Sequence, residues 1–182
     1  PTSKYCKVVS ADDVIFPECL MQMVQLAEAH PSVGIVGSYQ LSGGGDEWRV
    51  RCTGLPYQYR VVSGREICRR YLLTGLSVFG APTTNLYRCD LIRSSDAFFP
   101  NPTAEADIRA CMKHLREADF GFVHQVLSYE RRHSDQVTTT SRSLNAYVSS
   151  KLSDLQAYGS YYLTEPEVEQ CFKYLLDEYY KY

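Results

Sequence analysis

The chain has 182 residues, of which 45% are hydrophobic, 22% charged and 13% aromatic, a composition typical of soluble globular domains. Its 19 basic and 21 acidic residues give a formal net charge of −2, which excludes nucleic-acid binding driven by bulk charge. No apolar run approaches the ~18–20 residues that a membrane-spanning helix needs, so we expect no membrane span.

Seven cysteines are spread along the sequence, and no two of them form a Cys-x-x-Cys pair. This spacing argues against a structural zinc site. Their odd number and their mostly apolar surroundings favour reduced side chains that fill a core, so we expect a cytoplasmic protein.

The first half of the sequence predicts strands and helices in alternation. A helix that opens at Pro17 should end at His30, because the residue before a proline is pushed out of the helical region. A second helix over residues 64–74 is introduced by the capping-box pair Ser63 and Glu66. Apolar runs predict strands over residues 5–9 and 33–41, and alternation of apolar and charged residues predicts a strand over 48–51. The glycines at 43–45 predict a flexible turn.

The second half continues the alternation and then becomes helical. Strands are expected over residues 83–87 and 120–129, with a helix over 104–117 between them. A polar loop at 131–143 precedes helices over 144–158 and 165–181, the latter with a capping box from Thr164 to Glu167. We therefore predict an α/β fold in which a mixed sheet is flanked by helices. Residues 1–142 would form the α/β domain, and residues 143–182 a helical extension packed on it or on a partner.

Two adjacent acids, Asp12 and Asp13, follow the first strand. Carboxylates at the carboxyl end of a strand in an open α/β sheet lie where ligands usually bind. Their oxygens suit a hard divalent ion such as Mg²⁺ or Mn²⁺. A plain turn before a helix is the alternative, since Asp is favoured there for its own hydrogen bonding.

Charged residues also mark both ends of the segment from 104 to 133. Glu105 and Asp107 lie in the first turn of a predicted helix, where the helix dipole stabilises acids or where one of them acts as a general base. Arg131, Arg132 and His133 close the following strand. They could clamp a phosphate and, through His133, complete a metal shell, or they could belong to a solvated loop.

Three segments in order resemble glycosyltransferase family 2 enzymes of the GT-A fold. The segment KYCKVVSADDVIFPECLMQMVQLAEAHPSVGIVGSY resembles their metal-motif region. VFGAPTTNLYRCDLIR resembles their acceptor-side strand, and AEADIRACMKHLREADFGFVHQVLSYERRH resembles the stretch with their catalytic acid. The resemblance spans about residues 4–133.

The resemblance implies roles for individual residues. Asp12 falls on the last acid of the family's Asp-x-Asp metal motif, while Ser10 stands at the position of its first acid, and Asp13 becomes a supporting acid. His133 and Arg132 fall where some members hold the metal and the diphosphate.

The catalytic base of the family falls on Asp107. The residue before it is Ala106 rather than the family's Glu, so the acidic pair is broken and Glu105 is the acid that would compensate. The implied reaction is inverting transfer of a sugar from a nucleotide-diphosphate donor to a hydroxyl acceptor, assisted by a divalent metal, Mn²⁺ or Mg²⁺.

The sequence starts at the metal strand, without the βαβα segment that binds the nucleotide in this family. We therefore expect impaired transfer. The alternative is a non-catalytic remnant that forms a homo-oligomer, such as a homodimer, through an exposed sheet edge or through its tyrosine-rich C-terminal helix. Carbohydrate binding without catalysis, by Tyr57, Tyr59 and Tyr87, is a third reading.

Overall fold

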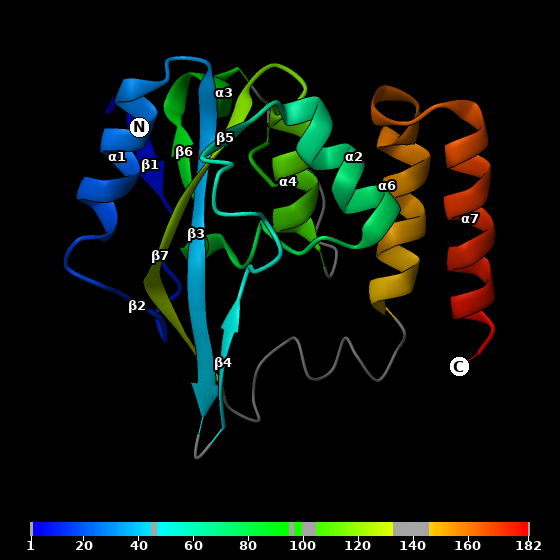
Figure 1. Cartoon of the computed structure of the whole chain (residues 1–182), viewed down its shortest axis with the longest axis horizontal. Helices are drawn as coiled ribbons and strands as arrows, with labels where there is room; N and C mark the ends of the chain where they lie inside the picture. Colours follow the sequence, from blue (N-terminus) through cyan, green and yellow to red (C-terminus); the bar gives the residue numbers. More distant parts are fainter. Residues whose placement is uncertain (1, 45–46, 95–96, 100–104, 133–145, 182) are drawn as a thin grey trace.

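A computed structural model describes residues 2–44, 47–94, 97–99, 105–132 and 146–181. Its centre is a parallel pair of long strands, β3 (Val33–Gly44) and β7 (Asp119–Arg131), which run side by side through the middle of the molecule (Figure 1). β4 (Glu47–Arg51) pairs antiparallel with the carboxyl-terminal half of β3, and this hairpin projects beyond the helices.

Four shorter strands complete the mixed sheet of the described chain, which has the path β1-β6-β3-β7-β2. β6 (Leu86–Arg88) lies beside β3, and β1 (Tyr5–Lys7) lies beyond it. On the opposite side of β7, β5 (Val61–Val62) pairs near its start and β2 (Val14–Ile15) pairs near its end.

Helices cover both faces of the sheet (Figure 1). α1 (Cys19–Ala29) packs on one face, against β3 and β7. α2 (Gly64–Thr74) and α4 (Ala106–His114) lie on the other face. α6 (Ala146–Tyr162) and α7 (Glu165–Tyr179) form an outer pair, and α6 contacts α2 and α4.

The two apolar cores follow from this layering. On the α1 side, Met23 and Leu26 meet Val36 and Leu127 of the central strands. The core on the other side is larger and includes residues of α2, α4, β7, α6 and α7, among them Ile67, Met112, Phe120, Leu155 and Cys171. The C-terminal helices thus share one core with the sheet.

The predicted mixed sheet with flanking helices is confirmed. The helix starts also follow the sequence signals: Ser63 Oγ accepts a hydrogen bond from the Glu66 amide at 3.2 Å, and Thr164 and Glu167 form the expected capping box. All seven cysteines are free. None of the described helices is long and apolar enough to cross a membrane.

Several local predictions were wrong. Gly43 and Gly44 belong to β3 rather than to a turn, because they pair with Trp48 and Glu47 of β4. The expected strand over 83–87 begins instead as a short 3-10 helix, η1 (Pro82–Thr84), since Pro82 fixes a helical first position. The structure also contains α3 (Cys89–Arg93), β2 and β5, which the sequence analysis missed.

Candidate functional site

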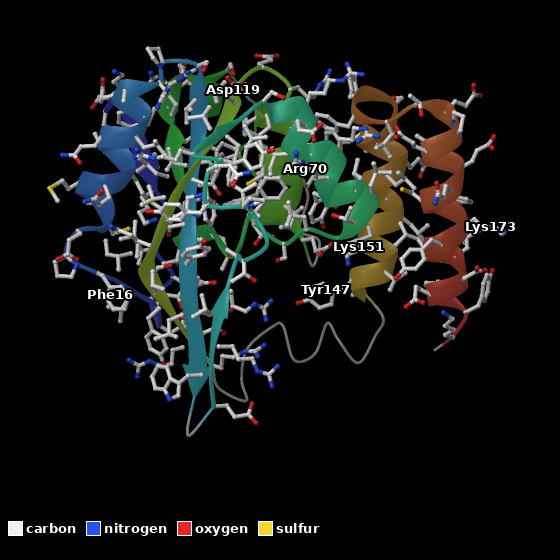
Figure 2. All side chains as sticks on the ribbon, in the orientation of Figure 1. Phe16, Arg70, Asp119, Tyr147, Lys151 and Lys173 are labelled. Carbon is white, nitrogen blue, oxygen red and sulfur yellow. The ribbon has the colours of Figure 1, made fainter. Side chains whose placement is uncertain are left out.

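A cavity of about 380 Å³ opens between the carboxyl ends of the central strands, the start of α4 and the start of α6. Figure 2 shows Tyr147 extending from the first turn of α6 on the side of the sheet. Three acidic and three basic side chains are in its wall. They are Glu105, Asp107, Glu130, Arg51, Arg132 and Lys151. The structure therefore brings together three residues singled out from the sequence, Glu105, Asp107 and Arg132.

Asp107 and Glu105 are positioned by the start of α4. The amide of Ile108 donates a hydrogen bond of 3.0 Å to Asp107 Oδ1, which fixes that carboxylate at the first turn. Burial raises the pKa of Asp107 to about 6 and that of Glu105 to about 7. Glu105 Oε2 is buried and has no hydrogen-bond partner among the described residues. Both acids can therefore change protonation state near neutral pH, as a general base must.

Glu130, near the end of β7, acts electrostatically on both Asp107 and Asp13. Ser42 Oγ donates a hydrogen bond of 2.6 Å to Glu130 Oε2 across the β3–β7 pair. The charge of Glu130 contributes to raising the pKa of both Asp107 and Asp13. Glu130 is thus within electrostatic reach of the acids at both ends of the site.

The basic side chains come from three separate elements. Arg51 ends β4, Arg132 follows β7, and Lys151 lies one helical turn after Tyr147 on α6. The Arg132 amide donates to the Gly43 carbonyl at 2.8 Å, which holds the backbone of this residue against β3. A cluster of cations next to carboxylates can bind a ligand that has both phosphate and hydroxyl groups.

Gln40 provides a donor without an acceptor in the cavity wall. Its side chain is 2% exposed, and the amide nitrogen Nε2 has no hydrogen-bond partner among the described residues. A buried donor left unpaired costs about 1–3 kcal/mol, so an oxygen of a ligand in the cavity would remove this cost. The sequence analysis missed Gln40, which it placed in an apolar strand.

Asp12 and Asp13 lie in the turn between β1 and β2. The Asp13 amide donates to the Ser10 carbonyl at 3.1 Å, and the Ser10 amide donates to Thr83 Oγ1 at 3.1 Å. Burial raises the pKa of Asp13, and the negative charges of Asp12 and Glu130 act in the same direction. Neither acid is in the cavity wall, and the turn is linked to the cavity through the charge of Glu130, which lines the cavity and raises the pKa of Asp13.

The predicted metal site can be examined only for those candidate ligands that lie in the described part of the chain. Among the described residues, no three His, Cys, Asp or Glu side chains converge on one point that could hold a metal ion. His133, predicted to bind both metal and diphosphate, lies outside the described residues.

Some residues of the cavity wall were not predicted from the sequence, although the sequence contains weak signals for them. Period-two alternation in the strand over 48–51 places Arg49 and Arg51 on one face. Tyr147 and Lys151 are four residues apart, which predicts one helix face. No sequence feature predicts that Glu130 and Gln40 share a cavity, because their proximity depends on the pairing of β3 with β7.

Comparison with known proteins shows a short similarity to a glucosyltransferase. No protein-family model matches the chain. A segment of 48 residues is 42% identical to the glucans biosynthesis glucosyltransferase H of Nitrosomonas europaea. The matched segment makes up 26% of this chain and 6% of the length of that relative. Over this segment the chain is glycosyltransferase-like.

Proposed function

We propose that the chain forms the base and acceptor side of a glycosyltransferase active site. The reaction would be transfer of a sugar, with inversion, from a nucleotide-diphosphate donor to a hydroxyl acceptor. One observation carries the proposal: a single cavity joins Asp107, an acid with a pKa of about 6, to three cations. The similarity to a glucosyltransferase and the resemblance to glycosyltransferase family 2 enzymes of the GT-A fold support it.

Asp107 is the proposed general base. Its carboxylate takes the proton of the acceptor hydroxyl, and the hydroxyl oxygen forms a bond to the anomeric carbon of the sugar. The bond from that carbon to the diphosphate oxygen breaks, and its electron pair leaves with the diphosphate. Arg51, Arg132 and Lys151 would balance the charge that grows on this leaving group.

A divalent metal fits the acids of the β1–β2 turn by charge and by ligand type. Asp12 and Asp13 are adjacent, and the charges of Asp12 and Glu130 both raise the pKa of Asp13, so a cation there would relieve repulsion among carboxylates. Asp12 and Asp13 would provide oxygen ligands to Mn²⁺ or Mg²⁺. When bound, such an ion neutralises charge on a diphosphate.

Calorimetric titration of the chain with UDP-sugars and GDP-sugars, with and without Mn²⁺, tests the donor part of the proposal. We expect binding that requires Mn²⁺ and that Asp12→Ala abolishes, while Asp177→Ala, at an exposed position of α7, binds normally. Absence of binding to every donor, or equal binding by both variants, would contradict a donor site at this turn.

A second titration isolates the base. Asp107→Asn should bind the donor as the unsubstituted chain does but should release nucleotide diphosphate about 10²–10⁴ times more slowly when an acceptor is added. This pattern separates loss of chemistry from loss of binding.

Self-association is the second candidate function, because aromatic side chains are exposed on α7. Tyr174 is 63% exposed, and Phe172 and Tyr179 are also exposed on this helix. Tyrosine and phenylalanine are enriched in protein interfaces. Light scattering with size-exclusion chromatography over a micromolar concentration range should give a dimer mass that Phe172→Ser lowers. A monomer mass at every concentration would contradict this candidate.

A further inference from the structure

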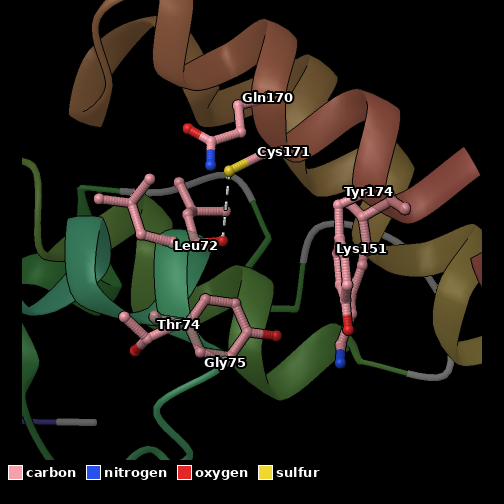
Figure 3. Close-up of a pocket in the computed structure, with 10 residues that line it drawn as sticks. Leu72, Thr74, Gly75, Lys151, Gln170, Cys171 and Tyr174 are labelled. Atoms are coloured by element: carbon pink, nitrogen blue, oxygen red, sulfur yellow. Dashed lines mark hydrogen bonds between the residues drawn. The ribbon is translucent and has the colours of Figure 1, made fainter. Parts of the chain in front are cut away.

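A second cavity, of about 330 Å³, lies between the end of α2 and the two C-terminal helices. Figure 3 shows Leu72, Thr74 and Gly75 of the α2 end on one side of it, and Gln170, Cys171 and Tyr174 of α7 on the other. Its volume is within the range of about 300–1,000 Å³ that is typical of small-molecule sites.

The walls of this cavity are apolar along most of their length. Leu72, Leu73 and Leu175 provide aliphatic surface, and Tyr174 provides an aromatic ring at the exposed edge. The Cys171 thiol donates to the Leu72 carbonyl at 3.5 Å, the contact drawn as a dashed line in Figure 3. Such walls suit an alkyl chain or an aromatic ring.

Polar side chains line this cavity at several points, among them Tyr71, Thr74, Lys151 and Gln170. Tyr71 is 8% exposed, and its hydroxyl has no hydrogen-bond partner among the described residues. The negative charges of Glu105, Asp154 and Asp107 help to raise the pKa of Tyr71, after the larger effect of burial, so this ring lies close to those acids. Tyr71 thus lines the second cavity, while Glu105 and Asp107 line the candidate active site.

Lys151 connects the second cavity with the candidate active site, because its side chain lines both. In the view of Figure 3 its side chain overlaps that of Tyr174, and its amino group points away from Cys171. A ligand with its apolar part among the leucines would meet Tyr71 and Lys151 at its polar end. Beyond these two residues lie Glu105 and Asp107.

We propose that the second cavity binds the apolar part of an amphipathic acceptor, such as an alkyl or aryl glycoside, whose hydroxyl group extends past Lys151 toward Asp107. The inference rests on the proposed function, since it assigns the acceptor class for the same base. Tyr71 and Lys151 are positioning residues in this arrangement: they hold the polar end of the acceptor by hydrogen bonds.

The test uses n-octyl β-D-glucopyranoside below its micelle concentration, titrated into the full chain without donor, and compares it with D-glucose. We expect saturable binding of the octyl glucoside at least about tenfold tighter than that of glucose, since each buried methylene adds affinity. Gln170→Trp, which places a large ring at the cavity wall, should weaken binding about tenfold or more. Lys173→Trp is the matched control, because Lys173 is an exposed residue of the same helix that does not line the cavity (Figure 2).

Equal affinity for octyl glucoside and glucose, or equal binding by the two tryptophan variants, would overturn the assignment of this cavity. Circular dichroism of both variants shows whether the fold is retained. The proposed function has a separate readout, the release of nucleotide diphosphate and its loss in Asp107→Asn. A transfer rate that Asp107→Asn leaves unchanged would overturn the role of the base, whatever the octyl glucoside titration shows.

Discussion

Arg109 of α4 donates a hydrogen bond of 2.6 Å from Nε to Oδ1 of Asp154 on α6, and both side chains are buried. Arg109 also donates to Ser153 Oγ at 3.1 Å. This ion pair joins the helix that positions Asp107 to the helix that carries Lys151. The shape of the candidate site therefore depends on a polar contact inside the molecule.

Breaking this pair should destabilise the fold. Asp154→Asn or Arg109→Met should each lower the free energy of unfolding by about 3–5 kcal/mol, because each leaves an uncompensated buried partner. The double replacement Arg109→Met with Asp154→Leu should lose less than the sum of the single changes. Urea denaturation measures all three, and additive losses would show that the pair is not coupled.

Glu105 should make stability depend on pH. Its pKa is about 7 in the folded chain, above its ordinary value of 4.5, so the folded state binds the proton more tightly between these values. Stability should fall as pH rises through this window and level off above it. At about pH 8, Glu105→Gln should be more stable than the unsubstituted chain by about 1–2 kcal/mol, with no difference at about pH 4.

Urea denaturation at both pH values checks this prediction. Glu117→Gln is the control, because Glu117 follows α4 and its side chain is exposed. If Glu105→Gln brings no gain at high pH, the Glu105 carboxylate is not buried as described.

The transfer rate should follow the titration of Asp107. A base with a pKa of about 6 is protonated in acid, so the rate should rise about tenfold per pH unit below that value and reach a plateau above it. Asp107→Asn should lower the rate by about 10²–10⁴ and remove this pH dependence. A rate that falls between pH 5 and 7 would identify an acid rather than a base as the limiting group.

Trp48 reports on the β3–β4 hairpin, since it is the only tryptophan of the chain. Its ring stacks on the ring of Tyr129, with the two ring centroids 5.2 Å apart. A Cβ added at Gly43 would lie 3.0 Å from the Trp48 indole and 2.5 Å from the Glu47 carbonyl oxygen. Gly43→Ala should therefore displace the ring and destabilise the hairpin by about 1–3 kcal/mol.

Tryptophan fluorescence measures this displacement directly. Tyr129→Phe is the control: it keeps the ring under Trp48 but loses the hydrogen bond of 2.9 Å from the Tyr129 hydroxyl to the Gly43 carbonyl. An emission spectrum unchanged by Gly43→Ala would mean that the stacking is absent in solution.

The long elements could be predicted because each has a local signal. α2 has the Ser63 cap, α1 ends before Pro31, and β7 is rich in aromatic and aliphatic residues between Phe120 and Tyr129. β2 and β5 are two residues long, too short for any alternation to appear, and they form only because β7 offers unpaired backbone on that side. Local signals in the sequence do not contain that information.

The residues of the candidate site also fall into two groups, those that the sequence predicts and those that only tertiary packing brings to the site. Asp107 and Arg132 stand in segments with a family resemblance and could be named, and the cavity contains both. Gln40 and Glu130 meet only through the β3–β7 pairing, and Lys151 reaches the cavity only because α6 packs against α4 and α2. Their roles depend on tertiary packing, which spacing in the sequence does not show.

The parallel pairing of β3 with β7 also has a consequence for the order of folding. Residues 33–43 of β3 pair in parallel with residues 119–131 of β7, so this central contact of the sheet closes a long stretch of chain. Loop closure of this kind costs entropy before any contact forms, and it slows folding. During synthesis, α1 and the β3–β4 hairpin must wait with an unpaired strand edge until β7 has left the ribosome. In that interval the nascent chain should be most prone to aggregation.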